Sequence, residues 1–260
     1  MASVKMVFQR LEKKYLINEA QKSELLQRAS NYLTDDVFDA ATVCNIYFDT
    51  DRYDLITTSL QKPPYKEKLR LRSYGVAHKD STVYLEIKKK CKGIVNKRRI
   101  SLNETEAVLL LQTGKLPHHN TQIQAEIDYF IQYYQPKPKV YIAYERSALI
   151  GKSAPDLRIT FDQNIRRRYD HLDLTYETDG KTVLDDDKIL MEIKVPGAYP
   201  LWLTRILSDM KLYPTSFSKY GTVFLHDMVK SKTPIIQKQD QFISNPAIQK
   251  EEAFSCLQVY

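Results

Sequence analysis

The chain has 260 residues, 43% of them hydrophobic and 27% charged, which is typical of a globular protein with a sizeable core. Its 39 Lys and Arg outnumber the 32 Asp and Glu, so the formal net charge is +7. The seven glycines are widely spaced, which excludes the clustered glycines of a P-loop, a dinucleotide-binding loop or a GxSxG nucleophile elbow.

The domain organisation is simple. Residues 1–230 show short alternating segments separated by a few helical ones throughout, which predicts one domain. Residues 231–260 are more polar and less periodic, which predicts a C-terminal tail, partly helical near 247–257. No apolar stretch is long enough to span a bilayer, and the N-terminal segment lacks the apolar core of a signal peptide. We therefore expect a cytoplasmic protein with no membrane segment in this chain, which leaves room for a membrane partner.

Strand and helix patterns follow one another along the chain. Apolar and charged residues alternate at 10–17, 69–72, 83–88, 95–99, 140–146, 157–162 and 191–195, which predicts strands with two different faces. Asn18 and Asn103 each begin a capping-box pattern and predict helix starts. Helical spacing of apolar residues predicts a helix at 122–134, and Pro200 is suited to the first turn of another.

The charged faces of these strands are mostly basic. They hold Lys14, Arg70, Arg72, Lys88, Lys97, Arg99, Arg146, Arg158 and Lys194. Their acidic residues are concentrated in Glu12, Glu86 and Glu192, whereas an ordinary surface mixes both signs more evenly. If the sheet closed into a barrel, a chain of phosphates would suit its lumen, since arginine forks match phosphate oxygens. Glu192, with Glu12 or Glu86, could then hold a divalent cation.

A plainer interpretation stays open for each residue. A solvated face of an antiparallel sheet shows the same alternation, and Arg70 or Arg72 could simply pair with Glu86 across two strands. Arg166 to Arg168 are expected in an exposed turn that could steer anions towards the mouth.

Nine short motifs together resemble a known family. In order and spacing they are similar to the polyphosphate polymerase catalytic domain of the vacuolar transporter chaperone (VTC) type, within the triphosphate tunnel metalloenzyme superfamily, over about residues 6–229. The motifs are Arg10-Leu-Glu12-Lys-Lys14-Tyr15-Leu-Ile, Tyr47-Phe48-Asp49-Thr50, Lys68-Leu-Arg70-Leu-Arg72, Glu86-Ile-Lys88-Lys, Val95-Asn-Lys97-Arg98-Arg99, Tyr144-Glu-Arg146-Ser-Ala148, Leu157-Arg158-Ile-Thr-Phe-Asp162, Met191-Glu192-Ile-Lys194 and Ser216-Phe-Ser218-Lys219-Tyr220.

The resemblance implies an α+β fold: a closed, antiparallel eight-stranded tunnel barrel with helices on its exterior. It implies transfer of the γ-phosphate of ATP onto a growing polyphosphate chain, with Mn²⁺ or Mg²⁺ as cofactor. The residues that it places on phosphates are Lys14, Arg70, Arg72, Lys88, Lys97, Arg146, Arg158, Lys194 and Lys219, with Tyr144 and Ser218 as hydrogen-bond donors. Glu192 would anchor the metal, and Arg99 shares the basic face.

Two departures and two rival functions accompany the resemblance. Arg10 stands where the hydrolytic branch of the superfamily has a glutamate, and Ser216 stands where eukaryotic relatives of the polymerase have a lysine. The first rival is a tunnel hydrolase of inorganic triphosphate or a nucleoside triphosphate. The second is a non-enzymatic module that binds a polyanion or RNA, although we expect no stable complex with nucleic acid.

Overall fold

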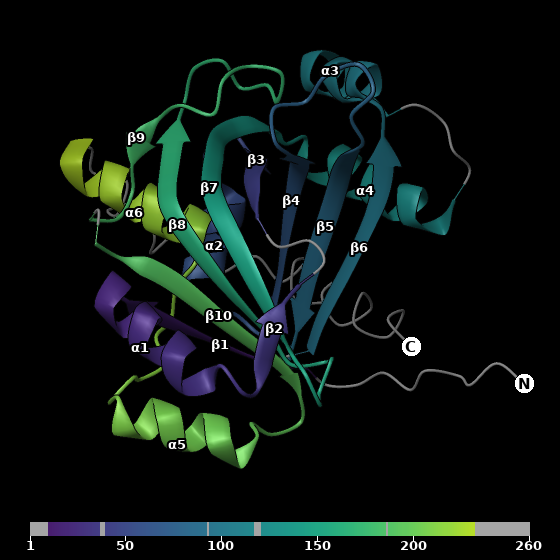
Figure 1. Ribbon diagram of the computed structural model, residues 1–260. Coiled ribbons are helices and arrows are strands. Elements are labelled where there is room, and N and C mark those ends of the chain that lie inside the picture. Colours follow the sequence, from purple (N-terminus) through teal and green to yellow (C-terminus); the bar gives the residue numbers. More distant parts are fainter. Residues whose placement is uncertain (1–9, 37–39, 93, 117–120, 186, 232–260) are drawn as a thin grey trace, which may run out of the picture.

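The computed structural model describes residues 10–36, 40–92, 94–116, 121–185 and 187–231, which form one large sheet and six helices (Figure 1). The strands are β1 (Arg10–Ile17), β2 (Leu33–Asp35), β3 (Ala41–Asp49), β4 (Tyr65–Tyr74), β5 (Val83–Cys91), β6 (Ile94–Leu102), β7 (Lys137–Gly151), β8 (Arg158–Arg168), β9 (Lys181–Thr182) and β10 (Ile189–Pro196). The helices are α1 (Glu19–Ala29), α2 (Asp54–Leu60), α3 (Glu104–Thr113), α4 (Gln122–Tyr134), α5 (Leu201–Asp209) and α6 (Lys219–Ser231).

The predicted antiparallel α+β fold is confirmed, but the closed barrel is wrong. The strand order is β1-β10-β8-β7-β3-β4-β5-β6, with β2 added to β7 and β9 to β8, so β1 and β6 are edge strands within the described residues. Closure would need a ladder between those two edges. Instead, part of the free edge of β1 is taken up by a loop, because the amide of Thr215 donates to the carbonyl of Lys14 over 2.7 Å.

Four helices cover the outer, apolar face of the sheet. One core lies between β1, β8, β10 and the helices α1 and α5, and a second lies between β3, β4, β5 and the helices α3 and α4 (Figure 1). The capping boxes predicted at Asn18 and Asn103 are present, and α4 has the predicted bounds. Pro200 precedes α5 as its N-cap. Within the described residues, no helix is long and apolar enough to cross a bilayer.

The remaining two helices, α2 and α6, pack on the inner face of the sheet. Tyr220, Val223 and Phe224 of α6 and Ile56 of α2 share a core with inner-face residues of β3 and β7, such as Val43 and Ile142. The expectation that helices lie only on the exterior is therefore wrong. α2 has only seven residues, and α6 begins at Lys219, within the motif Ser218-Lys219-Tyr220 that the sequence analysis assigned to phosphate binding.

A buried carboxylate fixes both inner helices. Asp49, at the end of β3, accepts hydrogen bonds from the backbone amides of Leu55 (2.9 Å) and Ile56 (3.0 Å) in α2. The hydroxyl of Tyr220 in α6 donates to the same carboxylate over 2.9 Å. Because Asp49 is completely buried, these donors replace the water that an ionised carboxylate requires.

The Arg166–Arg168 run is not an exposed turn. It ends β8, and Arg167 and Arg168 are buried. The guanidinium of Arg168 lies 3.6 Å from the ring centroid of Tyr141 and donates to the carbonyls of His171, Asp173 and Glu177. It therefore organises the loop that follows β8, because a rigid five-donor fork can satisfy several carbonyls at once.

The C-terminal tail expected at 231–260, including its helix near 247–257, lies outside the described residues except for Ser231, which ends α6. The domain boundary near residue 230 stays a prediction.

The contact between Tyr220 and Asp49 gives a stability prediction. We expect Tyr220→Phe to lower the free energy of unfolding by about 1–3 kcal/mol, because it removes a buried hydrogen bond to a charged acceptor. The measurement is urea unfolding followed by far-UV circular dichroism. Tyr213→Phe is the control, since Tyr213 is 75% exposed, and it should be close to neutral. Equal effects of the two substitutions would contradict this account of α6.

Candidate functional site

The register of β4, β5 and β6 arranges charged side chains in rows across the inner face. Directly opposite residues share a face, so the register itself defines the rows. The first row is Lys68, Lys88 and Lys97; the second is Arg70, Glu86 and Arg99; the third is Arg72, Tyr84 and Ser101. The predicted basic face is thus continuous over three strands, and its first row has three lysines and no acid.

A second set of rows lies on β1, β10 and β8. The register aligns Glu12 with Lys194 and Arg158, and Lys14 with Glu192 and Thr160. On the next strand, β7, Arg146 lies opposite Asp162. Basic and acidic residues alternate in this set, in contrast to the first row of β4, β5 and β6.

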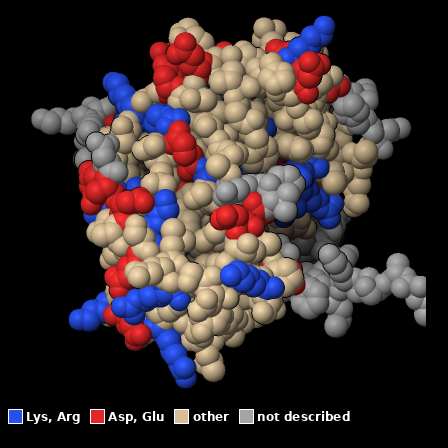
Figure 2. Space-filling model, in the orientation of Figure 1, with Lys and Arg blue, Asp and Glu red and all other residues tan. Residues whose placement is uncertain are grey.

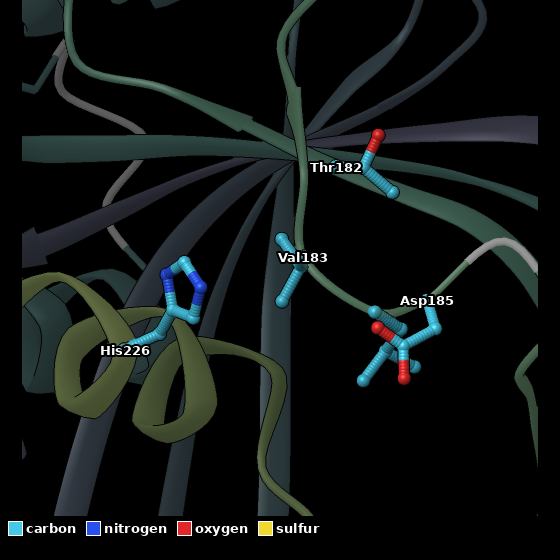
Figure 3. Close-up of a pocket in the computed structure, with 5 residues that line it drawn as sticks. Thr182, Val183, Asp185 and His226 are labelled. Carbon is cyan, nitrogen blue, oxygen red and sulfur yellow. The ribbon is translucent and has the colours of Figure 1, made fainter.

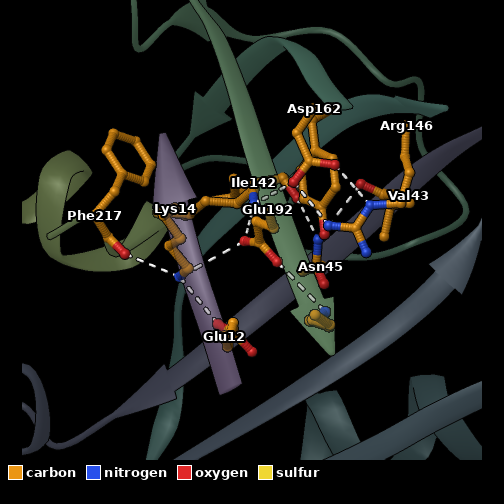
Figure 4. A network of polar contacts seen from close by, with 12 residues as sticks. Glu12, Lys14, Val43, Asn45, Ile142, Arg146, Asp162, Glu192 and Phe217 are labelled. Carbon is orange, nitrogen blue, oxygen red and sulfur yellow. Dashed lines mark hydrogen bonds and ion pairs between the residues drawn. The ribbon is translucent and has the colours of Figure 1, made fainter. Parts of the chain in front are cut away.

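Two buried carboxylates hold the second set together (Figure 4). Asp162 accepts two hydrogen bonds from Arg146, at 2.6 and 2.7 Å, and a third from the ammonium of Lys219. Glu192 lies 3.5 Å from the same ammonium and 3.6 Å from that of Lys14. Because both carboxylates are buried, these cations keep them ionised, and the pKa values of Asp162 and Glu192 lie below the ordinary range although burial alone would raise them.

Glu86 plays the same part in the first set of rows. It is 1% exposed, and Arg70 holds it at 2.7 Å and Lys97 at 2.6 Å. Burial raises the pKa of Glu86, but the charges of Arg70, Arg72 and Lys97 outweigh burial and lower it to about 2. The plainer expectation of a pair with Glu86 is thus met for Arg70. Arg72 also lies within 3.9 Å of Glu86, and it donates to the side chain of Asn45 over 2.9 Å.

The two sets of rows face each other across the curled sheet. The segment before α6 contacts both: Ser218 accepts from Lys68 of β4 over 3.2 Å, and the next residue, Lys219, reaches Asp162 of β8. Phe217 adds a carbonyl that accepts from Lys14 of β1 over 2.9 Å. Residues 215–219 therefore connect β1 with β4, which closes part of the channel without a strand ladder.

Some of the cations have no acidic partner. Within the described residues, Lys68, Lys88 and Arg99 form no ion pair; Arg99 lies over the ring of Tyr84, 4.4 Å from its centroid. Burial and the charges of neighbouring lysines lower the pKa of Lys68 to about 8. Loss of hydration also lowers the pKa of Lys88. On the face shown in Figure 2, Lys and Arg gather in a hollow over β5 and β6.

The pKa values of two buried tyrosines reflect the positive charge around them. Burial raises the pKa of Tyr47 and of Tyr144, yet the net pKa of both is below the ordinary value, because Arg70 acts on the first and Arg72 on the second, together with other cations. Cations that lower the pKa of a buried phenol against the effect of burial give the site an excess of positive charge. Such a site suits a polyanion.

The predicted residues differ in how closely they converge. Lys14, Arg70, Arg72, Lys88, Lys97, Arg146, Tyr144, Ser218, Lys194 and Lys219 all lie on the inner face or the segment that crosses it. Arg158 lies at the rim, 41% exposed and 2.8 Å from Asp36, and Arg99 lies on the edge strand. Glu12, Glu86 and Glu192 do not form a three-ligand cluster, and none exists among the described residues.

The sequence interpretation missed several site residues. Asp162, which binds Arg146 and Lys219, and Asn45, which binds Arg72, had no assigned role. Asp162 has the same strand parity as Arg158, so the alternation already placed it on the charged face. Asn45 gave no such signal, because β3 is buried on both faces. Away from the site, a surface pocket between β9 and α6 is lined by Thr182, Val183, Leu184, Asp185 and His226 (Figure 3).

A family model described as the VTC domain matches residues 9–225 of this chain. A comparison with curated proteins finds no significant match. Among solved structures, a proposed adenylate cyclase from Bacillus halodurans has a TM-score of 0.50 at 17% identity, over 80% of this chain and 93% of that one. A proposed adenylyl cyclase from Hippeastrum with a dominant triphosphatase activity has a TM-score of 0.49 at 13% identity, over 88% and 99%. At 17% identity the first likeness concerns the fold alone.

The lowered pKa of Glu86 gives a prediction for acid stability. A carboxyl whose folded pKa is about 2 stabilises the fold fully above its ordinary pKa of 4.5, and this stability is lost as the pH falls towards 2. The loss amounts to about 3 kcal/mol. We therefore expect Glu86→Gln to unfold more easily at pH 6 and to show a decline between pH 5 and pH 3 that is shallower by about 2 kcal/mol, the part of the loss that falls in this range.

The measurement is the urea midpoint at several pH values. Glu177→Gln, at an exposed position on the loop after β8, is the control and should follow the wild type. An unchanged acid slope in Glu86→Gln would contradict the role given to the Glu86 ion pairs.

Proposed function

The chain belongs to the VTC domain family, and we propose that it is a polyphosphate polymerase that transfers the γ-phosphate of ATP onto the end of a polyphosphate chain. The observation that carries the proposal is the row of Lys68, Lys88 and Lys97, set among further cations on the inner face of the sheet. Like charges placed directly opposite one another destabilise a sheet, so such a row is best explained by an anionic occupant. A chain of phosphates matches its length and sign.

In the proposed reaction a terminal oxygen of the polyphosphate attacks the γ-phosphorus of ATP. The bond from that phosphorus to the β,γ-bridging oxygen breaks, and ADP leaves with the electron pair. Charge spreads over the equatorial oxygens in the transition state, where lysine and arginine donors stabilise it. Because the acceptor oxygen is already ionised at neutral pH, no side chain has to remove a proton from it.

The cations divide into two groups by their partners. Arg70, Arg146 and Lys219 are anchored on buried carboxylates, so their positions are set before a ligand arrives. Lys68 and Lys88 are not neutralised, and they would supply charge to the phosphates. Preorganised donors lose little entropy on binding, which favours recognition of a flexible chain.

A divalent metal fits at one end of the site. Glu192 and Glu12 lie 3.6 and 3.7 Å from the ammonium of Lys14, and the buried hydroxyl of Thr160, aligned with Glu192, has no hydrogen-bond partner in the described part of the chain. Mg²⁺ and Mn²⁺ take one or two carboxylates and complete their shell with phosphate oxygens and water. When bound there, the metal would neutralise charge on the transferred phosphate. Because Glu192 also contacts Lys194 and Lys219, a bound metal would have to displace ammonium groups from it. Glu86 lies in the other set of rows, where Arg70 and Lys97 hold it.

The product of turnover tests the proposal directly. We expect incubation with ATP and Mn²⁺ to give ADP and long polyphosphate, resolved by gel electrophoresis, because the basic channel retains the polymer. Orthophosphate as the sole phosphate product would support the tunnel hydrolase instead. Removal of divalent metal with a chelator should stop turnover in either case.

Lys88 provides the sharpest substitution. Because it forms no ion pair, Lys88→Ala leaves no carboxylate unpaired and should fold like the wild type, whereas turnover should fall by about 100-fold through the loss of one transition-state donor. Lys13→Ala removes the same charge from the opposite face of β1 and should retain activity. Retention of full turnover by Lys88→Ala would contradict the role of the lysine row.

Lys68 gives a prediction for pH dependence. The pKa of Lys68 is about 8 in the free protein, so its amine carries a positive charge below pH 8 and is mostly neutral above it. The affinity for inorganic triphosphate should therefore fall between pH 7 and pH 9. In Lys68→Arg the charge persists throughout this range, so the fall should be smaller. Isothermal titration calorimetry measures both; identical pH profiles would contradict the assignment.

A further inference from the structure

A second pair of lysines continues the basic row outwards along β4 and β5. Lys66 lies directly opposite Lys90, two residues along each strand from the pair of Lys68 and Lys88. A shift of two residues returns to the same face of the sheet and moves about 6.6–6.8 Å along the strand. The inner face of these strands thus has two successive rungs made only of lysine.

These outer lysines lack acidic partners. The ammonium of Lys66 donates to the carbonyl of Ser59 over 2.9 Å, and within the described residues neither Lys66 nor Lys90 forms an ion pair. Burial, then the charges of Lys90 and Lys62, lower the pKa of Lys66. The repulsion therefore extends beyond the two facing residues to Lys62, in the loop between α2 and β4.

The opposite face of the same strands provides an internal comparison. Between the two lysine rungs, Glu67 lies opposite Lys89, and Lys89 also pairs with Glu126 of α4 over 2.9 Å. The chain thus places an acid against a base on the outer face and has no acid in the two inner rungs that flank this pair. Random surface placement of lysines would not make this distinction between alternate residues, since opposite-charge rungs stabilise a sheet and like-charge rungs weaken it.

We propose that Lys66 and Lys90 bind the part of a linear polyphosphate chain that extends along β4 and β5 beyond the row of Lys68, Lys88 and Lys97. The inference rests on the proposed function and adds to it a polymer subsite along β4 and β5. A chain that lies on the first lysine row reaches the second rung by continuing in the same direction. A short ligand such as inorganic triphosphate, held on the inner residues, does not need that rung.

The test compares a double variant with a charge-matched control. Lys66→Gln with Lys90→Gln removes the outer rung, and Lys79→Gln with Lys115→Gln removes the same charge from two exposed positions elsewhere. Equilibrium binding of long linear polyphosphate and of inorganic triphosphate is measured for both variants and the wild type without divalent metal, at several salt concentrations.

We expect the outer-rung variant to lose about tenfold in affinity for the long chain and to change by less than about twofold for triphosphate, with a salt slope lower by roughly 1.4 for two released contacts. The control should keep both affinities. The outer-rung variant should also unfold at a higher urea concentration at low salt, because it removes the repulsion between facing lysines. This second readout shows that the variant is folded.

Several results would overturn the subsite: unchanged binding of the long chain, an equal loss for triphosphate, or an equal loss in the control. Single-stranded RNA that displaces the long polyphosphate at equal charge would overturn its assignment to polyphosphate. The subsite and the proposed function fail separately. If the protein makes no polymer, yet long-chain binding is lost only in the outer-rung variant, the subsite stands and the proposed function fails. If the protein makes polymer and the outer-rung variant shows no such loss, the function stands and the subsite fails.

Discussion

The architecture depends on placing more positive than negative charge on one face of a sheet, around a few carboxylates that are themselves buried. An isolated buried charge is costly, and it is tolerated only where hydrogen-bonded partners replace water. Three carboxylates, Glu86, Asp162 and Glu192, perform this task, and each binds two or more cations. They act as fixed points around which arginine and lysine side chains are set before any ligand arrives.

This constraint explains why the sequence predicted the site better than the closure of the sheet. A period of two assigns each residue of a strand to one face, so the position of Arg72, Lys88 or Lys194 on a common face follows from counting along the chain. Closure depends on whether the backbone of β1 meets that of β6, and no side-chain pattern encodes it. In the structure Thr215 uses part of that edge, a contact between residues about 200 positions apart.

The burial of Arg167 and Arg168 could not be predicted from the sequence pattern. Three consecutive arginines predict exposure, because guanidinium groups are rarely buried without partners. Arg167 and Arg168 find theirs in Asp227 of α6 and in carbonyls of the loop after β8, all brought together only by the tertiary fold. The same holds for Asn45, whose amide is needed to orient Arg72 within an otherwise apolar strand. Polar groups inside a core are predictable only when their partners are known.

The segment from Thr215 to Lys219 links stability to the site in one short stretch of chain. Its backbone and side chains bind Lys14, Lys68, Asp162 and Glu192, which belong to four strands on both sides of the channel. Lys219 is neutralised by two carboxylates, whereas Lys68 donates to the Ser218 hydroxyl and forms no ion pair among the described residues. The same connection therefore bridges the two sides of the site while Lys68 and Lys88 form no ion pair in the described part of the chain. The ion pairs that hold the strands together are thus ones that a polyanion on these two lysines does not have to break.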